Sequence, residues 1–286
     1  MTELRVGLAQ IAPVLGDVPG NLRKHLDMIE EAKKQNVQLL CFPELSLTGY
    51  LLKDLVPDVA MMASETDPIM AELISASQSM DLLIGFVEED LRHRYYISAA
   101  YLSHRRIVRV HRKVYLTTYG MFEEGRYWAP GDRFCAFDTE FARVGILICE
   151  DFWHMSSAYT LWLDGADALL LISASPGRGL SPETRLGSSR SVELVNQMYA
   201  TFLTNFVLHC NRVGFEDGLN FWGGSTVFGP EGNLEAQAPY FEETLLTATL
   251  DLGALRRVRI RLPLLRDERP GVLQKALDRI GRGAMS

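Results

Sequence analysis

Hydrophobic and polar positions along the chain form two recurring patterns, short apolar runs and longer stretches with a helical period. The first apolar run covers 5–11 and predicts a strand. In the segment that follows, apolar residues fall on one helical face and charged residues on the other, and Asn21 is expected to cap this helix. A fully apolar run at 38–42, stopped by Pro43, predicts a second strand. This strand–helix–strand order predicts a crossover unit with parallel strands.

The rest of the chain continues the same alternation. Helices are predicted at 68–79 and 188–202, with basic helix-like segments after Leu252. Further strands are predicted at 82–87, 97–102, 107–111, 144–149, 168–172, 207–211, 225–228, 233–236 and 244–250. The strands at 97–102 and 107–111 flank a polar turn and predict a hairpin, so antiparallel pairs must accompany the parallel ones. The predicted fold class is therefore α/β, with one mixed sheet or two sheets packed together, covered by helices.

Length and composition narrow the organisation of the chain. The 286 residues are 47% hydrophobic and 23% charged, as in ordinary globular proteins. This length fits either two domains of about 150 residues each or one large core. Since no low-complexity linker or internal repeat divides the chain, we expect a single domain over 1–286.

The charge balance excludes several classes of protein. Lys and Arg number 29 and Asp and Glu number 36, and the net charge of −7 argues against nucleic-acid binding. No apolar run reaches the roughly 18–20 residues of a membrane helix, and residues 1–8 lack the order of a signal peptide. We therefore expect no membrane association and a cytoplasmic location. The arginine-rich segment 252–286 is expected to be a packing or interface segment against the acidic remainder.

The cysteines indicate neither a disulfide framework nor a zinc site. Four of them, Cys41, Cys135, Cys149 and Cys210, are too few for a disulfide scaffold in a chain of this length. None lies close to another or at a zinc-finger spacing from a histidine, so no metal is predicted. Each cysteine is therefore either a small buried hydrophobe or, singly, a reactive thiol.

Side chains that could take part in catalysis lie at the ends of three different predicted strands. Glu44, Lys113 and Cys149 each come at or just after such an end. Because the ends of strands converge in α/β sheets, we expect the three to share a sheet and to meet at its edge. Taken singly, they could be a surface carboxylate, a solvated charge and a core side chain. Together they supply a base, a cation for a developing oxyanion and a nucleophile.

The segments around these three residues carry a family resemblance. They read FPELSLTGY at 42–50, HRKVYL at 111–116 and GILICEDFW at 145–153. In this order and spacing they resemble the signatures of the nitrilase, or carbon–nitrogen hydrolase, superfamily, and the resemblance spans nearly the whole chain. It is strongest with the glutaminase domain of glutamine-dependent NAD synthetases, through 42–55 and 113–128. The resemblance implies a four-layer α-β-β-α sandwich of two mixed sheets with helices outside.

The resemblance also implies a catalytic triad of Glu44, Lys113 and Cys149. Glu44 would be the general base, first for the thiol and later for water, because a free thiol is only slightly ionised at neutral pH. Lys113 would hold the other two residues in register and stabilise the tetrahedral oxyanion, helped by the backbone N–H after Cys149. Glu124 would be a proton shuttle or a positioning group, with a solvated turn carboxylate as the alternative. Neither a metal nor an organic cofactor is implied.

A substrate pocket follows from the same resemblance. Its lining would comprise Tyr119, Phe122, Glu150, Trp153 and Ser175. The aromatic side chains would form walls, and Glu150 would accept hydrogen bonds from a substrate ammonium or amide. The alternative for the aromatic residues is plain core packing. Asn211 could shape the pocket floor or belong to a turn, and the glycines of the segment 221–225 are expected to serve turns.

Departures from the family patterns bear on the substrate. True nitrilases usually carry Trp after the nucleophile, where this chain has Glu150, which disfavours a nitrile. The chain reads Ser-Ala-Ser-Pro at 173–176 where the glutaminases read Asn-Ala-Ser-Pro, which disfavours glutamine itself. A partner for a substrate carboxylate could be Arg178, Arg185 or Arg190. No Gly-x4-Gly-Lys-Ser/Thr loop occurs, so ATP chemistry is not predicted.

These observations predict a cysteine-dependent amidohydrolase. It would cleave a non-peptide C–N bond of a small linear amide, of ω-amide or N-carbamoyl type, through a thioester. The alternatives are a glutaminase subunit that passes ammonia to a separate synthetase, an N-acyltransferase, and an inactive interaction protein. The expected partners are a small-molecule amide and further copies of the chain, because family members pair through their helices into αββα–αββα dimers and often assemble further.

Overall fold

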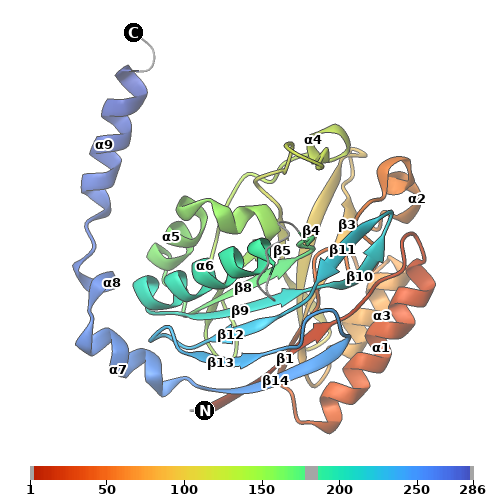
Figure 1. Ribbon diagram of the computed structural model, residues 1–286, viewed down its shortest axis with the longest axis horizontal. Helices are drawn as coiled ribbons and strands as arrows, with labels where there is room; N and C mark the ends of the chain where they lie inside the picture. The colour runs from red at the N-terminus through yellow and green to blue at the C-terminus, as the bar shows by residue number, and fades with distance from the viewer. Residues whose placement is uncertain (1–2, 178–185, 284–286) are drawn as a thin grey trace.

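Two facing six-stranded sheets organise the computed structural model, which describes residues 3–177 and 186–283 (Figure 1). The first sheet has the strand order β14-β1-β2-β3-β4-β5. Its strands are β1 (Glu3–Gln10), β2 (Leu39–Cys41), β3 (Asp81–Glu89), β4 (Tyr95–Ser103), β5 (Arg106–Arg112) and β14 (Thr244–Asp251). Strands β1, β2 and β3 are parallel, and the remaining pairs are antiparallel. The sheet is therefore mixed.

The second sheet repeats this plan with the order β13-β12-β9-β8-β7-β6. Its strands are β6 (Phe137–Asp138), β7 (Arg143–Ile148), β8 (Ala168–Ser173), β9 (Phe206–Asn211), β12 (Thr226–Phe228) and β13 (Leu234–Gln237). Strands β7, β8 and β9 are parallel, with antiparallel strands on both sides. Between β9 and β12, the chain forms a separate antiparallel ribbon of β10 (Val213–Glu216) and β11 (Leu219–Trp222), which the sequence pattern had not revealed.

Helices cover the outer face of each sheet (Figure 1). The first sheet carries α1 (Val18–Lys34) and α3 (Pro68–Ala76), and the second carries α5 (Met155–Leu163) and α6 (Gly187–Leu203). Short helical turns are η1 (Lys53–Leu55), α2 (Val56–Val59), α4 (Glu124–Tyr127) and η2 (Cys149–Trp153). The chain continues through α7 (Gly253–Arg261), α8 (Leu264–Asp267) and α9 (Pro270–Gly283), and α9 extends away from the sheets. None of the helices within the described ranges combines the length and apolarity needed to cross a bilayer.

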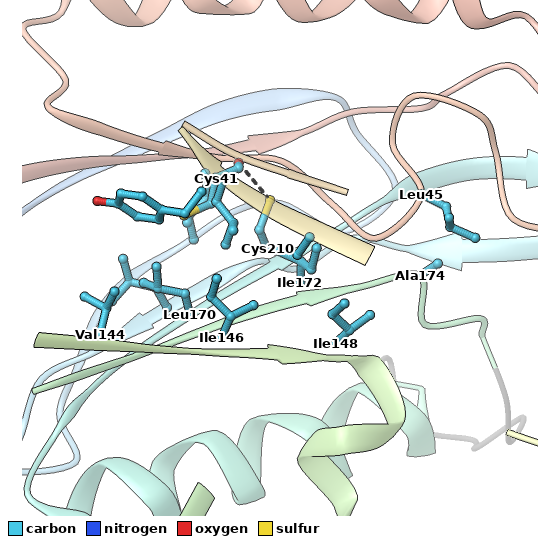
Figure 2. Packing of buried hydrophobic residues seen from close by; sticks show 14 of the residues in the cluster. Cys41, Leu45, Val144, Ile146, Ile148, Leu170, Ile172, Ala174 and Cys210 are labelled. Atoms are coloured by element: carbon cyan, nitrogen blue, oxygen red, sulfur yellow. Dashed lines mark hydrogen bonds between the residues drawn. The ribbon is translucent and has the colours of Figure 1, made fainter. Parts of the chain in front are cut away.

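Three apolar clusters separate these elements into four layers. One lies between α1, α3 and the first sheet, one between the two sheets, and one between the second sheet and α5 and α6. Strand β7 shows why its sequence is apolar throughout: Ile146 and Ile148 face the other sheet, while Leu147 faces the helices. Figure 2 shows Ile146, Ile148 and Leu170 in the space between the sheets. The predicted four-layer α-β-β-α sandwich is thereby confirmed.

Two local expectations were wrong. The first helix begins at Val18 with Asp17 as its N-cap, since the Asp17 carboxylate accepts the Gly20 N–H at 3.0 Å. Asn21 lies inside the helix, where its side-chain amide bonds the backbone of Val14 and the carbonyl of Leu47. This residue therefore ties two loops to the helix instead of starting it.

The second error concerns the sheet that carries the candidate site. Glu44 follows β2 and Lys113 follows β5, both in the first sheet, whereas Cys149 follows β7 in the second sheet. The three residues therefore meet across the space between two sheets and do not share one. The parallel strands of both sheets end at the same side of this space, which brings their ends together.

Candidate active site

Glu44 lies in the tight loop that follows β2. Pro43 ends the strand, and the loop crosses β3 so closely that a Cβ on Gly85 would lie 2.2 Å from the Pro43 carbonyl oxygen. Only glycine allows this approach. The Glu44 side chain is fully buried, and its Oε2 accepts the backbone N–H of Ala174 at 2.8 Å. The first residue of the site is thus bound by the second sheet's loop after β8.

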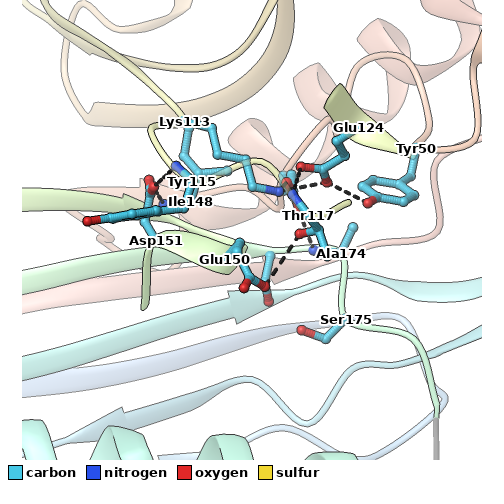
Figure 3. A network of polar contacts seen from close by, with 12 residues as sticks. Tyr50, Lys113, Tyr115, Thr117, Glu124, Ile148, Glu150, Asp151, Ala174 and Ser175 are labelled. Atoms are coloured by element: carbon cyan, nitrogen blue, oxygen red, sulfur yellow. Dashed lines mark hydrogen bonds and ion pairs between the residues drawn. The ribbon is translucent and has the colours of Figure 1, made fainter. Parts of the chain in front are cut away.

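Lys113 follows β5 and is also buried. Its Nζ lies 2.8 Å from Glu44 Oε1 and 2.8 Å from Glu124 Oε1. Figure 3 shows Lys113 pointing toward Glu124. The ammonium therefore bridges two carboxylates in the absence of bulk water. A buried charge requires such partners, because its desolvation is otherwise uncompensated.

Cys149 opens the turn between β7 and η2. Its φ of 45° lies in the left-handed region, which a residue with a side chain rarely occupies. Such strained backbone is concentrated at functional sites. Because Cys149 begins a helical turn, the first backbone N–H groups of that turn have no intrahelical acceptor, which makes them candidates for binding an anion. The side chain is half-buried.

The charges around the thiol set its protonation. Burial and the Glu44 carboxylate raise the pKa of Cys149 well above its usual value, against the opposing effect of Lys113. Burial also raises the pKa of Glu44, which Lys113 opposes. For Lys113, burial disfavours the charge, but Glu124 and Glu44 together raise its pKa well above the usual value. In the resting site Cys149 is therefore a thiol and Lys113 a protonated ammonium. Glu44 is a stronger base than an exposed carboxylate because its pKa is raised.

Glu124, at the start of α4, is buried and is no solvated turn carboxylate. Its Oε1 accepts the Tyr50 hydroxyl at 2.5 Å, and its Oε2 accepts the Thr117 N–H at 2.8 Å. Burial and Glu124 raise the pKa of Tyr50 well above its usual value, so this hydroxyl stays a donor. Glu124 is therefore a second anchor for Lys113, in addition to Glu44.

Asp151 connects the two sheets behind the site. Its buried carboxylate accepts the N–H groups of Val114 and Tyr115 at 2.9 and 3.0 Å, and that of Ile148 at 3.1 Å. It also lies 3.0 Å from the ring Nε2 of His111. The residues around Lys113 and the residue before Cys149 are thus bound to one carboxylate (Figure 3).

Of the predicted pocket residues, Glu150 and Phe122 are largely covered by protein, whereas Tyr119 and Trp153 are exposed. Glu150 is nearly buried, and both of its oxygens accept the Tyr119 hydroxyl, at 3.1 and 3.0 Å. Phe122 packs edge-on against the rings of Tyr119 and Tyr50. Tyr119 is 55% exposed and Trp153 is 46% exposed, so core packing does not explain them. Both are placed where an incoming molecule could reach them.

Ser175 follows the residue that binds Glu44. Its N–H donates to Asn211 Oδ1 at 2.9 Å, and the Ser173 hydroxyl donates to the same oxygen at 3.0 Å. Asn211 therefore shapes the loop from which Ala174 reaches Glu44, which is more than a turn role. Arg190 is exposed on α6. The other two candidate arginines, Arg178 and Arg185, lie outside the described residues.

Comparisons with known proteins show the family to which this chain belongs. A family model described as carbon-nitrogen hydrolase matches residues 5–260. The chain belongs to the carbon-nitrogen hydrolase family. A nitrilase from Pyrococcus abyssi is 30% identical over 90% of this chain and 93% of its own length. A carbon-nitrogen hydrolase structure from Helicobacter pylori G27 is 25% identical, covers 96% of this chain and 98% of its own, and superposes with a TM-score of 0.83.

A glutamine-dependent NAD(+) synthetase from Acinetobacter baylyi is 30% identical over 91% of this chain, but over 46% of its own length. The chain thus spans about half the length of the curated NAD synthetases that it matches. The resemblance read from the three sequence segments is confirmed at the level of the family.

Sequence reasoning missed two residues of the candidate site, Tyr50 and Asp151. Both lie inside the quoted motifs, at the end of FPELSLTGY and two residues after Cys149, so their spacing from the triad was the available signal. Cys41 and Cys210 are buried as expected, whereas Cys135 is half-buried. Across the described part of the chain, no group of three or more His, Cys, Asp or Glu residues could hold a metal ion.

Proposed function

We propose that this protein is a cysteine-dependent amidohydrolase that cleaves the C–N bond of a small linear amide, of ω-amide or N-carbamoyl type. The observation that carries the proposal is the buried Glu44–Lys113–Glu124 network next to Cys149. A base, a fixed cation and a thiol on strained backbone form the set that nucleophilic acyl transfer requires. Family membership supports a hydrolase of C–N bonds.

In the first step, Cys149 Sγ attacks the amide carbonyl carbon while Glu44 takes the thiol proton. Since the raised pKa of Cys149 keeps it protonated at rest, proton transfer accompanies attack. The negative charge on the carbonyl oxygen is stabilised by Lys113 Nζ and the backbone N–H of Glu150. The C–N bond then breaks, Glu44 returns its proton to the nitrogen, and ammonia or an amine leaves.

In the second step, Glu44 removes a proton from water, whose oxygen attacks the thioester carbon. The C–S bond breaks and the sulfur recovers the proton from Glu44, which releases the acid and restores the site. In this scheme Glu124 keeps Lys113 in place throughout and exchanges no proton. At the mouth, Glu150 and Tyr119 would bind the polar end of the substrate, with Phe122, Trp153 and Ser175 as further lining.

A second candidate is a glutaminase subunit that supplies ammonia to a separate synthetase. The observation that favours it is the match to one half of several glutamine-dependent NAD(+) synthetases. Ammonia release that is specific to glutamine, across a panel of ω-amides and N-carbamoyl amines, would favour this candidate. Turnover of other linear amides at equal or higher kcat/KM would favour the first.

The test of the mechanism is intact-protein mass spectrometry of Glu44→Gln after incubation with that amide panel. Glu44 serves both steps, so we expect turnover to be lost in this variant. Acylation is slow without the base, but an acyl group that reaches Cys149 should persist because water is not activated. Cys149→Ala should remain folded and show neither adduct nor turnover. Cys41→Ala and Cys135→Ala are the matched controls and should keep their activity. Turnover retained in Cys149→Ala would overturn the mechanism.

We also propose that copies of this chain associate. The outer faces of α5 and α6 expose Met155, Leu194 and Phe202, and α9 exposes Leu273 and Leu277. The segment 252–286 carries a net charge of +6, while the remainder of the chain carries −13. Apolar contact and charge complementarity both favour self-association. Light scattering should give a mass of at least twice 32.1 kDa, and a monomer would contradict the proposal.

A further inference from the structure

The β10–β11 ribbon contains a buried ion pair outside the candidate triad. Arg212 lies directly before β10, Glu216 ends it, and the Arg212 Nη1 to Glu216 Oε2 distance is 2.5 Å. Both side chains are almost completely buried. The guanidinium also stacks over the Phe221 ring at 4.1 Å. A buried pair of this kind contributes little net stability, because desolvation offsets its attraction.

The other oxygen of Glu216 binds the loop that follows Glu44. Its Oε1 accepts the N–H of Tyr50 at 2.8 Å and the N–H of Leu51 at 2.5 Å. The approach is so close that a Cβ on Gly49, whose φ is +81°, would lie 2.9 Å from Glu216 Oε2. The glycine thus permits a carboxylate from the second half of the chain to hold two consecutive amides of the first half.

From Tyr50 the contacts lead directly into the site. The Tyr50 hydroxyl donates to Glu124 Oε1 at 2.5 Å, and the same oxygen lies 2.8 Å from Lys113 Nζ. The Tyr50 ring is packed edge-on against Phe122 and Phe221. The backbone of Tyr50 therefore determines where its hydroxyl meets Glu124.

We propose that Glu216, neutralised by Arg212, is a positioning residue: it fixes the Tyr50 backbone and thereby holds Glu124 and Lys113 in place. This inference rests on the proposed amide hydrolysis for its rate effect. It assigns a role to the β10–β11 ribbon, which belongs to neither main sheet. A small displacement of Lys113 is sufficient to slow the reaction, because displacements near 1 Å cost up to about 100-fold in rate.

The test is a double-mutant cycle between Glu216 and Tyr50. Glu216→Gln removes the charge, whereas Glu216→Asp keeps the charge beside Arg212 but shortens the reach to the two amides. Each should lower kcat about tenfold while KM changes less than twofold. Combined with Tyr50→Phe, either change should lower kcat by less than a further twofold, because its effect passes through the Tyr50 hydroxyl. Phe215→Ser, on the exposed part of the same ribbon, is the control and should match the wild type.

A second readout separates this inference from the proposed function. The rate at which iodoacetamide alkylates Cys149, followed by intact mass, reports the arrangement around the thiol without any amide turnover. We expect the same non-additive slowing in this rate. The inference would be overturned if the Glu216 changes lowered kcat and the alkylation rate by the same factor with and without Tyr50→Phe. It would also be overturned if Glu216→Asp left both rates unchanged. A wild type that hydrolyses no amide, yet shows the non-additive alkylation, would overturn the proposed function only.

Discussion

The space between the two sheets has two chemically different ends, although the same two sheets form both. At the apolar end, Leu39, Tyr101 and Val144 line a cavity of only about 10 Å³. At the charged end, beyond the last residues of β2, β5 and β7, Lys113 and Glu124 are equally buried. Side chains at both ends are thus buried to a similar degree. At the apolar end they must fill the space, whereas at the charged end each charge must have a partner.

The loss of a side chain therefore has different effects at the two ends. An apolar side chain that is lost leaves a cavity, and the cost is stability alone. A charge that is lost leaves its partner buried and unpaired, and the partners here belong to both sheets. Two pairs of variants test this contrast directly, and two further pairs test the buried histidines and the mouth of the site.

The largest effect is expected for Lys113→Met compared with Leu170→Ala. Removal of the ammonium leaves Glu44 and Glu124 buried together, which should cost about 3–5 kcal/mol of stability and about 1,000-fold in kcat. Leu170→Ala, between the sheets at the apolar end, should cost about 2–5 kcal/mol and leave kcat unchanged. Urea unfolding and steady-state kinetics measure both quantities. A kcat of Lys113→Met within tenfold of the wild type would contradict the role of the cation.

The next effect compares two buried aspartates. Asp151→Asn replaces a carboxylate that accepts three backbone N–H groups, so we expect a loss of about 2–3 kcal/mol and about tenfold in kcat. Asp81, at the apolar end, accepts the Tyr101 hydroxyl at 2.6 Å, and burial raises its pKa. Asp81→Asn should cost about 1 kcal/mol with no change in kcat. An equal kcat in the two variants would show that Asp151 does not position the site.

A pH-dependent effect on stability, without an expected change in kcat, compares two buried histidines. Burial lowers the pKa of His25, which bonds Asn21 and Ser46, to about 4, and that of His209, which bonds Ser173, to about 3. Since the folded-state pKa values lie below the unfolded value near 6.5, the unfolded chain binds protons first. Stability should therefore be complete above pH 6.5 and fall as the pH drops toward 4 and then 3.

The measurement is urea unfolding of the wild type, His25→Asn and His209→Asn at pH 7, 6, 5 and 4. The stability difference between wild type and either variant should shrink by about 1.4 kcal/mol per pH unit below pH 6.5. A difference that does not change with pH would show that the histidine is already charged in the folded state.

The smallest effect concerns the mouth of the site. Tyr119→Phe removes the hydroxyl that Glu150 accepts, so the carboxylate should lose its fixed orientation and KM should rise about three- to tenfold with kcat nearly unchanged. Tyr115→Phe is the matched control, because its hydroxyl lies 3.4 Å from Ser156 and does not contact Glu150. A larger loss in kcat than in KM for Tyr119→Phe would place this residue in the chemical step.

Much of this architecture could be predicted from local pattern. The hairpin predicted at 97–102 and 107–111 is present as β4 and β5, and the apolar runs at 144–149 and 168–172 are the parallel neighbours β7 and β8. The predictions for β7 and β8 held because strands buried on both faces leave a continuous apolar signal. The hairpin was marked instead by the polar turn between its two strands. The cap at Asn21 was misassigned because Asp17, four residues earlier, offers the same capping chemistry.

The β10–β11 ribbon escaped prediction for a different reason. Its strands are four residues each, and a buried Glu216 interrupts the apolar alternation that identifies a strand. The charge is tolerated only because Arg212 and the amides of Tyr50 and Leu51 surround it. None of these partners can be recognised from residues adjacent in sequence.

The amino-acid order alone predicted the fold class through its apolar periods, indicated the family through the resemblance of three motifs, and placed Glu44, Lys113 and Cys149 at strand ends as candidates. Folding was needed to show that these residues come from two sheets and that Glu44 meets Ala174, 130 positions away. Which buried charges are paired depends on such long-range contacts. A local pattern specifies which side chains are available, and packing specifies which of them compensate one another.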